Sequence, residues 1–164
     1  MSKKNRPNVI VFFTDQQRWD TSGLHGNPLD LMPNFDRIAQ RGTHVRYSFT
    51  CQPVCGPARS CLQTGMYATT TGCFRNGIPL PTESKTLAHY FKDSGYQTGY
   101  IGKWHLATEE PVTEANRGGY DFWLASNVLE FTSDAYHMEV YDNDNNPVKL
   151  PGGTRSSVPE SVLD

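Results

Sequence analysis

Near its N-terminus the chain reads Asn8-Val-Ile-Val-Phe-Phe-Thr14, a continuous apolar run rich in β-branched side chains. A run of this kind predicts a strand that is buried on both faces, which is typical of a parallel sheet. The polarity changes at once after it, in Asp15-Gln16. Because α/β proteins place their chemistry at the carboxyl ends of parallel strands, we expect an α/β fold whose functional residues begin at position 15.

Helical and extended patterns alternate along the chain after this strand. Pro33 suits the first turn of a helix that Gly42 would end, and Thr86 suits the cap of another. The expected helices lie at residues 33–41, 58–66 and 86–92, and further strands are expected at residues 43–49 and 96–101. This order favours a doubly wound, mostly parallel sheet with flanking helices.

The number of clear strands is small for such a sheet. We find only two or three, so the chain 1–164 is expected to be the N-terminal part of a larger α/β domain, and incomplete. Residues 151–164 are polar and carry no clear element. A polar tail is expected there, and disorder of that tail is left open.

A polar segment near the C-terminus has two interpretations. Residues 138–141 and 147–150 flank the stretch Asp142-Asn-Asp-Asn-Asn146, which predicts a hairpin with a polar turn. The alternation of Asp and Asn also fits a calcium loop, but the glycine and the distal glutamate of an EF-hand are missing. The hairpin is the favoured interpretation.

Charge and hydropathy exclude several classes of protein. The 164 residues carry 15 basic and 17 acidic side chains, a net charge of −2. This balance argues against disorder throughout and against a nucleic-acid binder held by bulk charge. No run approaches the roughly 18 apolar residues of a membrane span, and the run at residues 9–13 is too short for a signal peptide. We therefore expect a cytoplasmic protein with neither nucleic-acid nor membrane partners.

Four cysteines lie at positions 51, 55, 61 and 73, within 23 residues. Their spacing matches no common zinc pattern, and no histidine stands at partner spacing. A cytoplasmic chain would keep them reduced. We expect Cys51, Cys61 and Cys73 to be small buried hydrophobes, and a zinc or redox module is left as a minor alternative.

Cys55 differs because of the segment that it opens, Cys55-Gly-Pro-Ala-Arg-Ser-Cys-Leu-Gln-Thr-Gly65. The segment resembles the signature of the sulfatase family of the alkaline phosphatase superfamily. That signature is Cys or Ser, any residue, Pro, a small residue, Arg, and a spacer that closes on Thr-Gly. In that family the first residue is converted after synthesis to formylglycine, and the Pro and Arg are what the modifying enzyme reads. Ala58 is a mild departure, since Ser is commoner there.

Two further segments carry the same resemblance. Asp15-Gln16 stands where sulfatases place an acidic pair that holds a divalent cation, with the Gln variant that some sulfatases and related phosphonate monoester hydrolases show. Gly102-Lys-Trp-His-Leu106 matches the family's Gly-Lys-Trp-His-Leu. Because alternate residues of an extended segment point the same way, Lys103 and His105 are expected to converge on one point.

Two weaker matches complete the resemblance, which is clearest over residues 7–106. Asn76 follows the signature at a spacing where related hydrolases place a polar substrate contact, although a plain turn residue in Arg75-Asn76-Gly77 is an equal alternative. Residues 32–39 resemble a helix of the family whose residues look structural.

The resemblance implies a metal and a nucleophile. Asp15, Gln16 and Cys55 would be the metal ligands, and calcium is the expected cation because it accepts carboxylate and amide oxygens. Cys55, as formylglycine, would be the nucleophile, because the hydrated aldehyde has one hydroxyl to attack sulfur and a second to expel sulfate. An unmodified thiol would be nearly inert.

It also implies roles around the substrate. Arg59 would offset charge, and Lys103 would bridge the nucleophile and the sulfate. His105 would hydrogen-bond the nucleophile and is the candidate base for sulfate expulsion. Asn76 would be a further substrate contact. The Lys/His pair favours sulfate esters, since related phosphonate monoester hydrolases tend not to carry it there.

The implied function is hydrolysis of a small-molecule or carbohydrate sulfate ester, with a formylglycine-generating enzyme as partner. The family supplies a second pair of metal ligands and a leaving-group acid from far downstream, and neither can be located here. We therefore expect a fragment that lacks the downstream half of the site. The alternatives are a phosphate or phosphonate ester hydrolase of the same superfamily, and a non-catalytic fragment that acts by binding.

Overall fold

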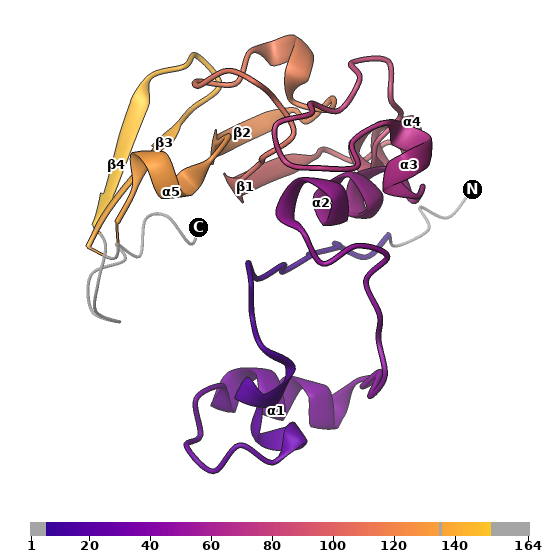
Figure 1. Ribbon diagram of the computed structural model, residues 1–164, viewed down its shortest axis with the longest axis vertical. Helices are drawn as coiled ribbons and strands as arrows, with labels where there is room; N and C mark the ends of the chain where they lie inside the picture. Colours follow the sequence, from indigo (N-terminus) through magenta and orange to yellow (C-terminus); the bar gives the residue numbers. More distant parts are fainter. Residues whose placement is uncertain (1–5, 135, 152–164) are drawn as a thin grey trace. The chain divides into compact units, whose positions relative to one another are not determined.

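The structure is a computed structural model that describes residues 6–134 and 136–151 (Figure 1). The chain consists of two compact units, Met1–Phe49 and Thr50–Asp164. Residues 152–164, where the sequence predicts a polar tail, lie outside the described residues. Within the described ranges no helix is long and apolar enough to cross a membrane.

The first unit is organised around one carboxylate. Its elements are the 3-10 turns η1 (Trp19–Thr21) and η2 (Gly23–His25) and the helix α1 (Pro33–Arg41), which confirms the helix predicted at residues 33–41. Asp36 of α1 accepts hydrogen bonds from Ser22 Oγ at 2.6 Å and from the Gly23 backbone N–H at 2.9 Å. The hydrogen bond from the Ser22 hydroxyl is the main reason why the pKa of Asp36 lies below its ordinary value. These bonds fasten η2 to α1.

The two strands predicted in this unit are not formed. Residues 8–14 and 43–49 lie in no helix or strand. The side chains of Ile10 and Phe12 are 88% and 90% exposed, so the apolar run is not buried. A strand is stable only when it is paired and packed, and among the described residues neither segment has a strand partner. The predictions were wrong because composition supplies the propensity for a strand but not its neighbour.

The second unit is built on one mixed sheet with the strand order β1-β2-β3-β4 (Figure 1). The strand β1 (Gly99–Lys103) pairs in parallel with β2 (Phe122–Ser126). The strands β3 (His137–Tyr141) and β4 (Pro147–Pro151) continue the sheet in antiparallel pairs. The α/β class is confirmed, and β1 begins three residues later than the strand predicted at 96–101.

Helices precede the sheet and connect its strands. They are α2 (Cys55–Thr64), α3 (Ala68–Thr71), α4 (Leu87–Asp93), the 3-10 turn η3 (Glu114–Asn116) and α5 (Leu129–Thr132). The helix α4 confirms the prediction at 86–92, including the cap by Thr86. The helix α2 begins three residues before the predicted start at 58, so Cys55 is its first residue and not part of the preceding loop.

The core of the second unit is aromatic. Trp104 and Trp123 are completely buried, and Tyr100 packs against both, stacked on Trp123 with 5.4 Å between ring centres. Tyr120 packs against the same rings and donates a hydrogen bond to Gln63 of α2 at 2.8 Å. The core therefore fixes α2 against the end of β1.

The cysteines differ from one another in burial. Cys73 is fully buried in the core, as predicted, but Cys51 is exposed and Cys61 is half-buried. The prediction that all three are buried was wrong for Cys51, which lies in the loop before α2, and Cys61 is covered only in part. All four cysteines are free thiols.

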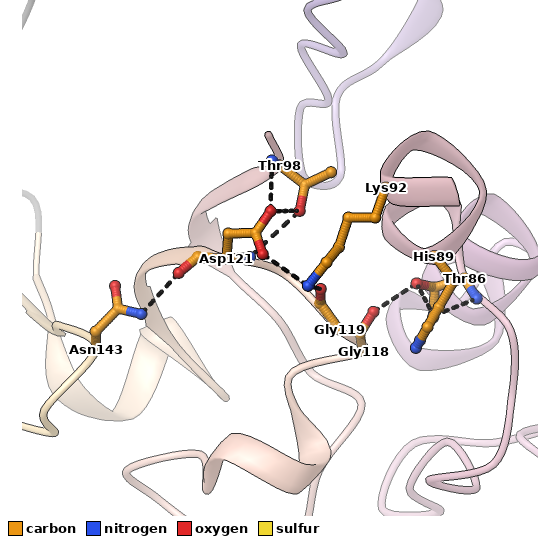
Figure 2. A network of polar contacts seen from close by, with 8 residues as sticks. All are labelled: Thr86, His89, Lys92, Thr98, Gly118, Gly119, Asp121 and Asn143. Carbon is orange, nitrogen blue, oxygen red and sulfur yellow. Dashed lines mark hydrogen bonds and ion pairs between the residues drawn. The ribbon is translucent and has the colours of Figure 1, made fainter. Parts of the chain in front are cut away.

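A polar network fastens α4 to the turn before β2 (Figure 2). Lys92 of α4 donates to the Gly119 carbonyl at 3.2 Å and forms an ion pair with Asp121 at 2.6 Å. Asp121 also accepts from the Thr98 backbone N–H at 3.0 Å. At the other end of α4, the Thr86 hydroxyl donates to the Gly118 carbonyl. The turn is thus held at both ends of the helix.

The hairpin predicted near the C-terminus is confirmed, and a buried arginine holds its turn. Arg117 donates to the Asn143 carbonyl at 2.8 Å and to Asn145 Oδ1 at 2.6 Å. Asp142 Oδ1 accepts from two backbone N–H groups of its own turn, those of Asp144 and Asn146. These bonds within the turn, together with the β3–β4 pairing, are those of a hairpin.

Candidate active site

The first turn of α2 carries Cys55 and lies against two other candidate residues. The Gly56 N–H donates to Asn76 Oδ1 at 2.8 Å. A Cβ on Gly56 would lie 3.1 Å from Asn76 Oδ1 and 3.5 Å from the His105 carbonyl oxygen. Glycine therefore permits a close approach that brings Asn76 and the backbone of His105 to the start of the helix. Asn76 is both a turn residue and a contact of this helix.

Arg59 connects α2 to the end of β1. Its side chain is buried, with 6% of the residue exposed. One guanidinium nitrogen donates to the Tyr100 hydroxyl at 3.2 Å and to the Lys103 carbonyl. Tyr100 donates to the same carbonyl. The position of Arg59 is therefore set by β1.

Lys103 is the last residue of β1 and is also buried. Its side chain is only 4% exposed, and its ammonium forms an ion pair with Glu130 of α5. The Glu130 side chain is 55% exposed, so the pair joins a buried cation to an accessible carboxylate. Glu130 was not foreseen from the sequence, because the segment 127–134 shows no pattern that would place it beside β1.

His105 follows β1 in a different backbone conformation. Its φ is +58°, in the left-handed region, and its N–H donates to the Asn127 carbonyl at 2.7 Å. The alternation of an extended strand ends at Lys103. The argument that Lys103 and His105 share a direction is therefore wrong as stated, since it assumed extended backbone through position 105.

Asn127 and Glu110 support the loop that carries His105. The Asn127 side chain exchanges hydrogen bonds with the backbone N–H and carbonyl of Ala107, at 3.1 and 2.9 Å. Glu110 in turn accepts from the Asn127 N–H at 2.6 Å. Sequence reasoning missed both residues, because only the parallel register of β1 and β2 places position 127 beside position 105.

Asp15 and Gln16 belong to the first unit. Both lie in an exposed bend, with Gln16 at a φ of +47°. Their adjacent carboxylate and amide supply oxygen donors, which suit a hard divalent cation. Among the described residues no three His, Cys, Asp or Glu side chains gather closely enough to form a metal site. The residues that the structure brings together are Cys55, Arg59, Asn76, Lys103 and His105.

These five residues form a cluster suited to an anion. Two buried cations, Arg59 and Lys103, meet through the Lys103 backbone, while Cys55 opens a helix that Asn76 holds. Cationic side chains fixed in a water-poor place stabilise negative charge more strongly than they would in water. Arg59 and Lys103 therefore supply positive charge that suits an anionic group, with the Lys103 ammonium held by Glu130.

Comparison with known families gives one match over most of the chain. The sequence model described as "Sulfatase" matches residues 7–156. A curated relative, the ulvan-active sulfatase of Formosa agariphila, is 39% identical over 150 residues, covering 90% of this chain and 29% of the relative. The chain thus spans less than a third of that relative.

Solved structures give the same picture of the fold. One, described as in complex with its substrate D-glucosamine-2-N,6-O-disulfate, superposes with a TM-score of 0.76 and 28% identity, covering 90% of this chain and 28% of the other. The phosphonate monoester hydrolase of Agrobacterium radiobacter superposes with a TM-score of 0.58 and 30% identity, covering 70% of this chain and 23% of the other.

Proposed function

Because the chain belongs to the sulfatase family, we propose that it is the N-terminal portion of a catalytic domain that hydrolyses sulfate monoesters. One observation carries the proposal: the segment Cys55–Gly65 forms a helix whose first residue is the expected nucleophile and whose Arg59 bonds to the end of β1. The chain spans 29% of its ulvan-active relative, so further residues of the site are expected from sequence beyond this match.

We assign the neutralisation of substrate charge to the two buried cations. A sulfate ester presents negative oxygens, and charge builds up on them as the nucleophile approaches. The guanidinium of Arg59 and the ammonium of Lys103 offset that charge, and they need little reorganisation because β1 and α5 already hold them. Glu130 positions the Lys103 ammonium, and Asn76 positions the first turn of α2.

Cys55 is proposed as the nucleophile after its conversion to formylglycine by a formylglycine-generating enzyme. It is half-buried and is the first residue of α2. His105 is proposed as the base on the resemblance of residues 102–106 to the family motif, and its backbone lies close to the start of α2. Its ring would accept the proton whose loss accompanies sulfate expulsion.

A divalent metal is part of the proposal, with calcium as the cation. Asp15, Gln16 and residue 55 would hold it, and their oxygen donors fit a hard cation. When bound, such an ion supplies Lewis-acid stabilisation of the sulfate oxygens. The substrate class proposed is a carbohydrate sulfate, which is supported by the names of the ulvan-active relative and of the glucosamine disulfate complex.

A second candidate function is phosphonate or phosphate ester hydrolysis. The structural similarity to a phosphonate monoester hydrolase favours it, and Gln16 lowers the charge of the proposed metal site by one unit relative to a carboxylate pair. The Lys103/His105 pair favours sulfate. Matched aryl sulfate, phosphate and phosphonate esters would separate the two reactions by their relative kcat/KM.

The test uses the protein produced from its complete gene together with a formylglycine-generating enzyme. We expect the Cys55 peptide to carry formylglycine and the protein to release sulfate from an aryl sulfate. Cys55→Ala should abolish turnover, and Cys51→Ser, at an exposed thiol outside the proposed site, should retain it. An unmodified Cys55 with no turnover, or equal turnover in Cys55→Ala, would overturn the proposal.

A further inference from the structure

Two cysteines of unassigned function lie side by side. Cys51 precedes α2 and is exposed, whereas Cys61 lies on the second turn of α2 and is half-buried. Their sulfur atoms are 2.9 Å apart. This separation is only about 0.9 Å longer than a disulfide bond, so a small side-chain movement would suffice to join them.

The two thiols line an open pocket of about 480 Å³. The other residues that line it are Gly65, Met66, Tyr67 and Thr70. Cys55 and Cys73 are not among the lining residues, and Cys73 is completely buried. A small molecule that enters this pocket therefore meets Cys51 and Cys61, and neither Cys55 nor Cys73 lines it.

We infer that Cys51 and Cys61 form a dithiol that a low-molecular-weight disulfide converts into an intrachain disulfide. The Cys51 thiolate attacks one sulfur of the small disulfide, forms a mixed disulfide and releases one small thiol. Cys61 then loses its proton to water and displaces the second small thiol from Cys51. The chain loses two hydrogens and two electrons, and the small disulfide is reduced to two thiols.

The environment of the two thiols supports this order of attack. Burial, together with the neighbouring Cys51, raises the pKa of Cys61 above its ordinary value, so Cys61 stays protonated longer. Cys51 is the accessible member, and the thiolate is the reacting form. Cys61 reacts second, when Cys51 already carries the leaving group beside it.

The disulfide would close a loop of eleven residues, 51–61, that contains Cys55. It would tie the segment 51–54 to α2 and leave Cys55 outside the pair. The two thiols nearest to Cys55 along the chain would then no longer be available to pair with it. This inference concerns thiol chemistry alone and does not depend on sulfate hydrolysis.

The experiment treats the reduced 164-residue chain with oxidised glutathione, alkylates the remaining thiols and maps the tryptic peptides without reduction. Trypsin cuts after Arg46, Arg59 and Arg75, so Cys51 and Cys61 fall in different peptides. We expect peptides 47–59 and 60–75 to be cross-linked, each with one alkyl group on its second cysteine. The mass of the product should be two hydrogens below the sum of the two singly alkylated peptides.

Three variants assign the bond, because peptide 47–59 also holds Cys55 and peptide 60–75 also holds Cys73. Cys51→Ser and Cys61→Ser should each abolish the cross-link, and Cys55→Ser should leave it unchanged. Stable glutathione adducts without a cross-link would overturn the inference. So would a cross-link that survives in Cys51→Ser or Cys61→Ser, since it would place the bond elsewhere.

Discussion

At the scale of single residues, the start of α2 depends on a few polar contacts from outside the helix. Val54, the residue before the helix, provides no side-chain cap. The Gly56 N–H is satisfied instead by Asn76, twenty residues further along the chain. The backbone next to Cys55 is therefore held by the turn that contains Asn76. From its sequence alone, that turn would be taken for a simple loop between helices.

We predict that Asn76→Ala lowers the free energy of unfolding by about 1 kcal/mol, because it leaves the Gly56 N–H without its acceptor. Urea unfolding followed by tryptophan fluorescence measures the change. Asn76→Asp is the matched control, since it keeps an acceptor oxygen and places negative charge near a helix N-terminus. Equal losses in the two variants would show that the hydrogen bond is not the stabilising feature.

A second prediction concerns Glu109, which accepts hydrogen bonds from Asn116 at 2.6 Å and from the Thr113 hydroxyl at 2.9 Å. Burial raises the pKa of Glu109, but these hydrogen bonds outweigh it and lower the pKa to about 2. The unfolded chain takes up the proton first as the pH falls, so the stability that Glu109 contributes is present above about pH 4.5 and is lost toward pH 2.

Glu109→Gln should therefore be less stable than the parent at pH 7, and the difference should shrink as the pH falls from about 4.5 to 2. Unfolding free energies over this range provide the measurement. Asn116→Ala is the companion variant. Without the Asn116 donor the pKa of Glu109 should rise, so the stability that Glu109 contributes should be lost at a higher pH. A difference between parent and Glu109→Gln that is constant with pH would contradict the assignment.

Motif residues were easier to predict than the residues that support them. Cys55, Arg59 and Lys103 stand at fixed offsets within short segments, and the structure places them in one cluster. Glu130 and Asn127 belong to no recognisable motif, and their contacts exist only after β1 and β2 pair in parallel. Local sequence shows which side chains are reactive, whereas their partners depend on tertiary register.

At the scale of elements, helices with clear ends and the C-terminal hairpin were predicted well, whereas the two apolar strands of the first unit were not. The helices α1 and α4 have Pro33 and Thr86 at their starts, and both lie within one residue of the prediction. The segments 8–14 and 43–49 have strand-like composition but no strand partner within the described chain. A helix satisfies its backbone locally, whereas a strand needs a neighbour that sequence composition does not identify.

The turn between α4 and β2 offers an element-scale prediction. A Cβ on Gly118 would lie 2.8 Å from the Trp104 ring, and its φ is +61°. We expect Gly118→Ala to lower the free energy of unfolding by about 3 kcal/mol, from backbone strain and overpacking together. Gly72→Ala is the matched control, because its φ is +83° and nothing lies within 4 Å of the added Cβ.

Gly72→Ala should cost only about 1 kcal/mol, which is the backbone cost alone. Thermal unfolding of both variants beside the parent gives the comparison. Equal shifts of the midpoint would mean that Trp104 and Thr86 move aside freely, and that the packing around Gly118 is not tight.

At the scale of the whole molecule, the described chain divides into two units of different character. The second has an aromatic core and a sheet, whereas the first is held by α1 and its contacts with η2. The first unit also exposes a run of five large apolar side chains, Val9 to Phe13. Contiguous exposed apolar segments with strand propensity favour association between chains.

We therefore predict that the 164-residue chain self-associates through this run. Replacing Ile10 and Phe12 together by Lys should raise, by about tenfold, the concentration at which light scattering first detects oligomers, since charge opposes strand pairing. Phe131→Lys is the control, because Phe131 is 87% exposed but lies outside that run. If Phe131→Lys raised that concentration by the same factor, association would depend on exposed apolar side chains in general and not on the run Val9 to Phe13.

The arginine beneath the β3–β4 turn has a consequence for how this part of the chain responds to its solution. Arg117 donates to two neutral oxygens of the turn, and its positive charge acts on the neighbouring carboxylates of Asp142 and Asp144. Chelators and changes in divalent-ion concentration should leave this hairpin untouched. An effect of divalent ions on the protein from the complete gene would then have to arise outside this turn, and Asp15 and Gln16 are the site proposed for it.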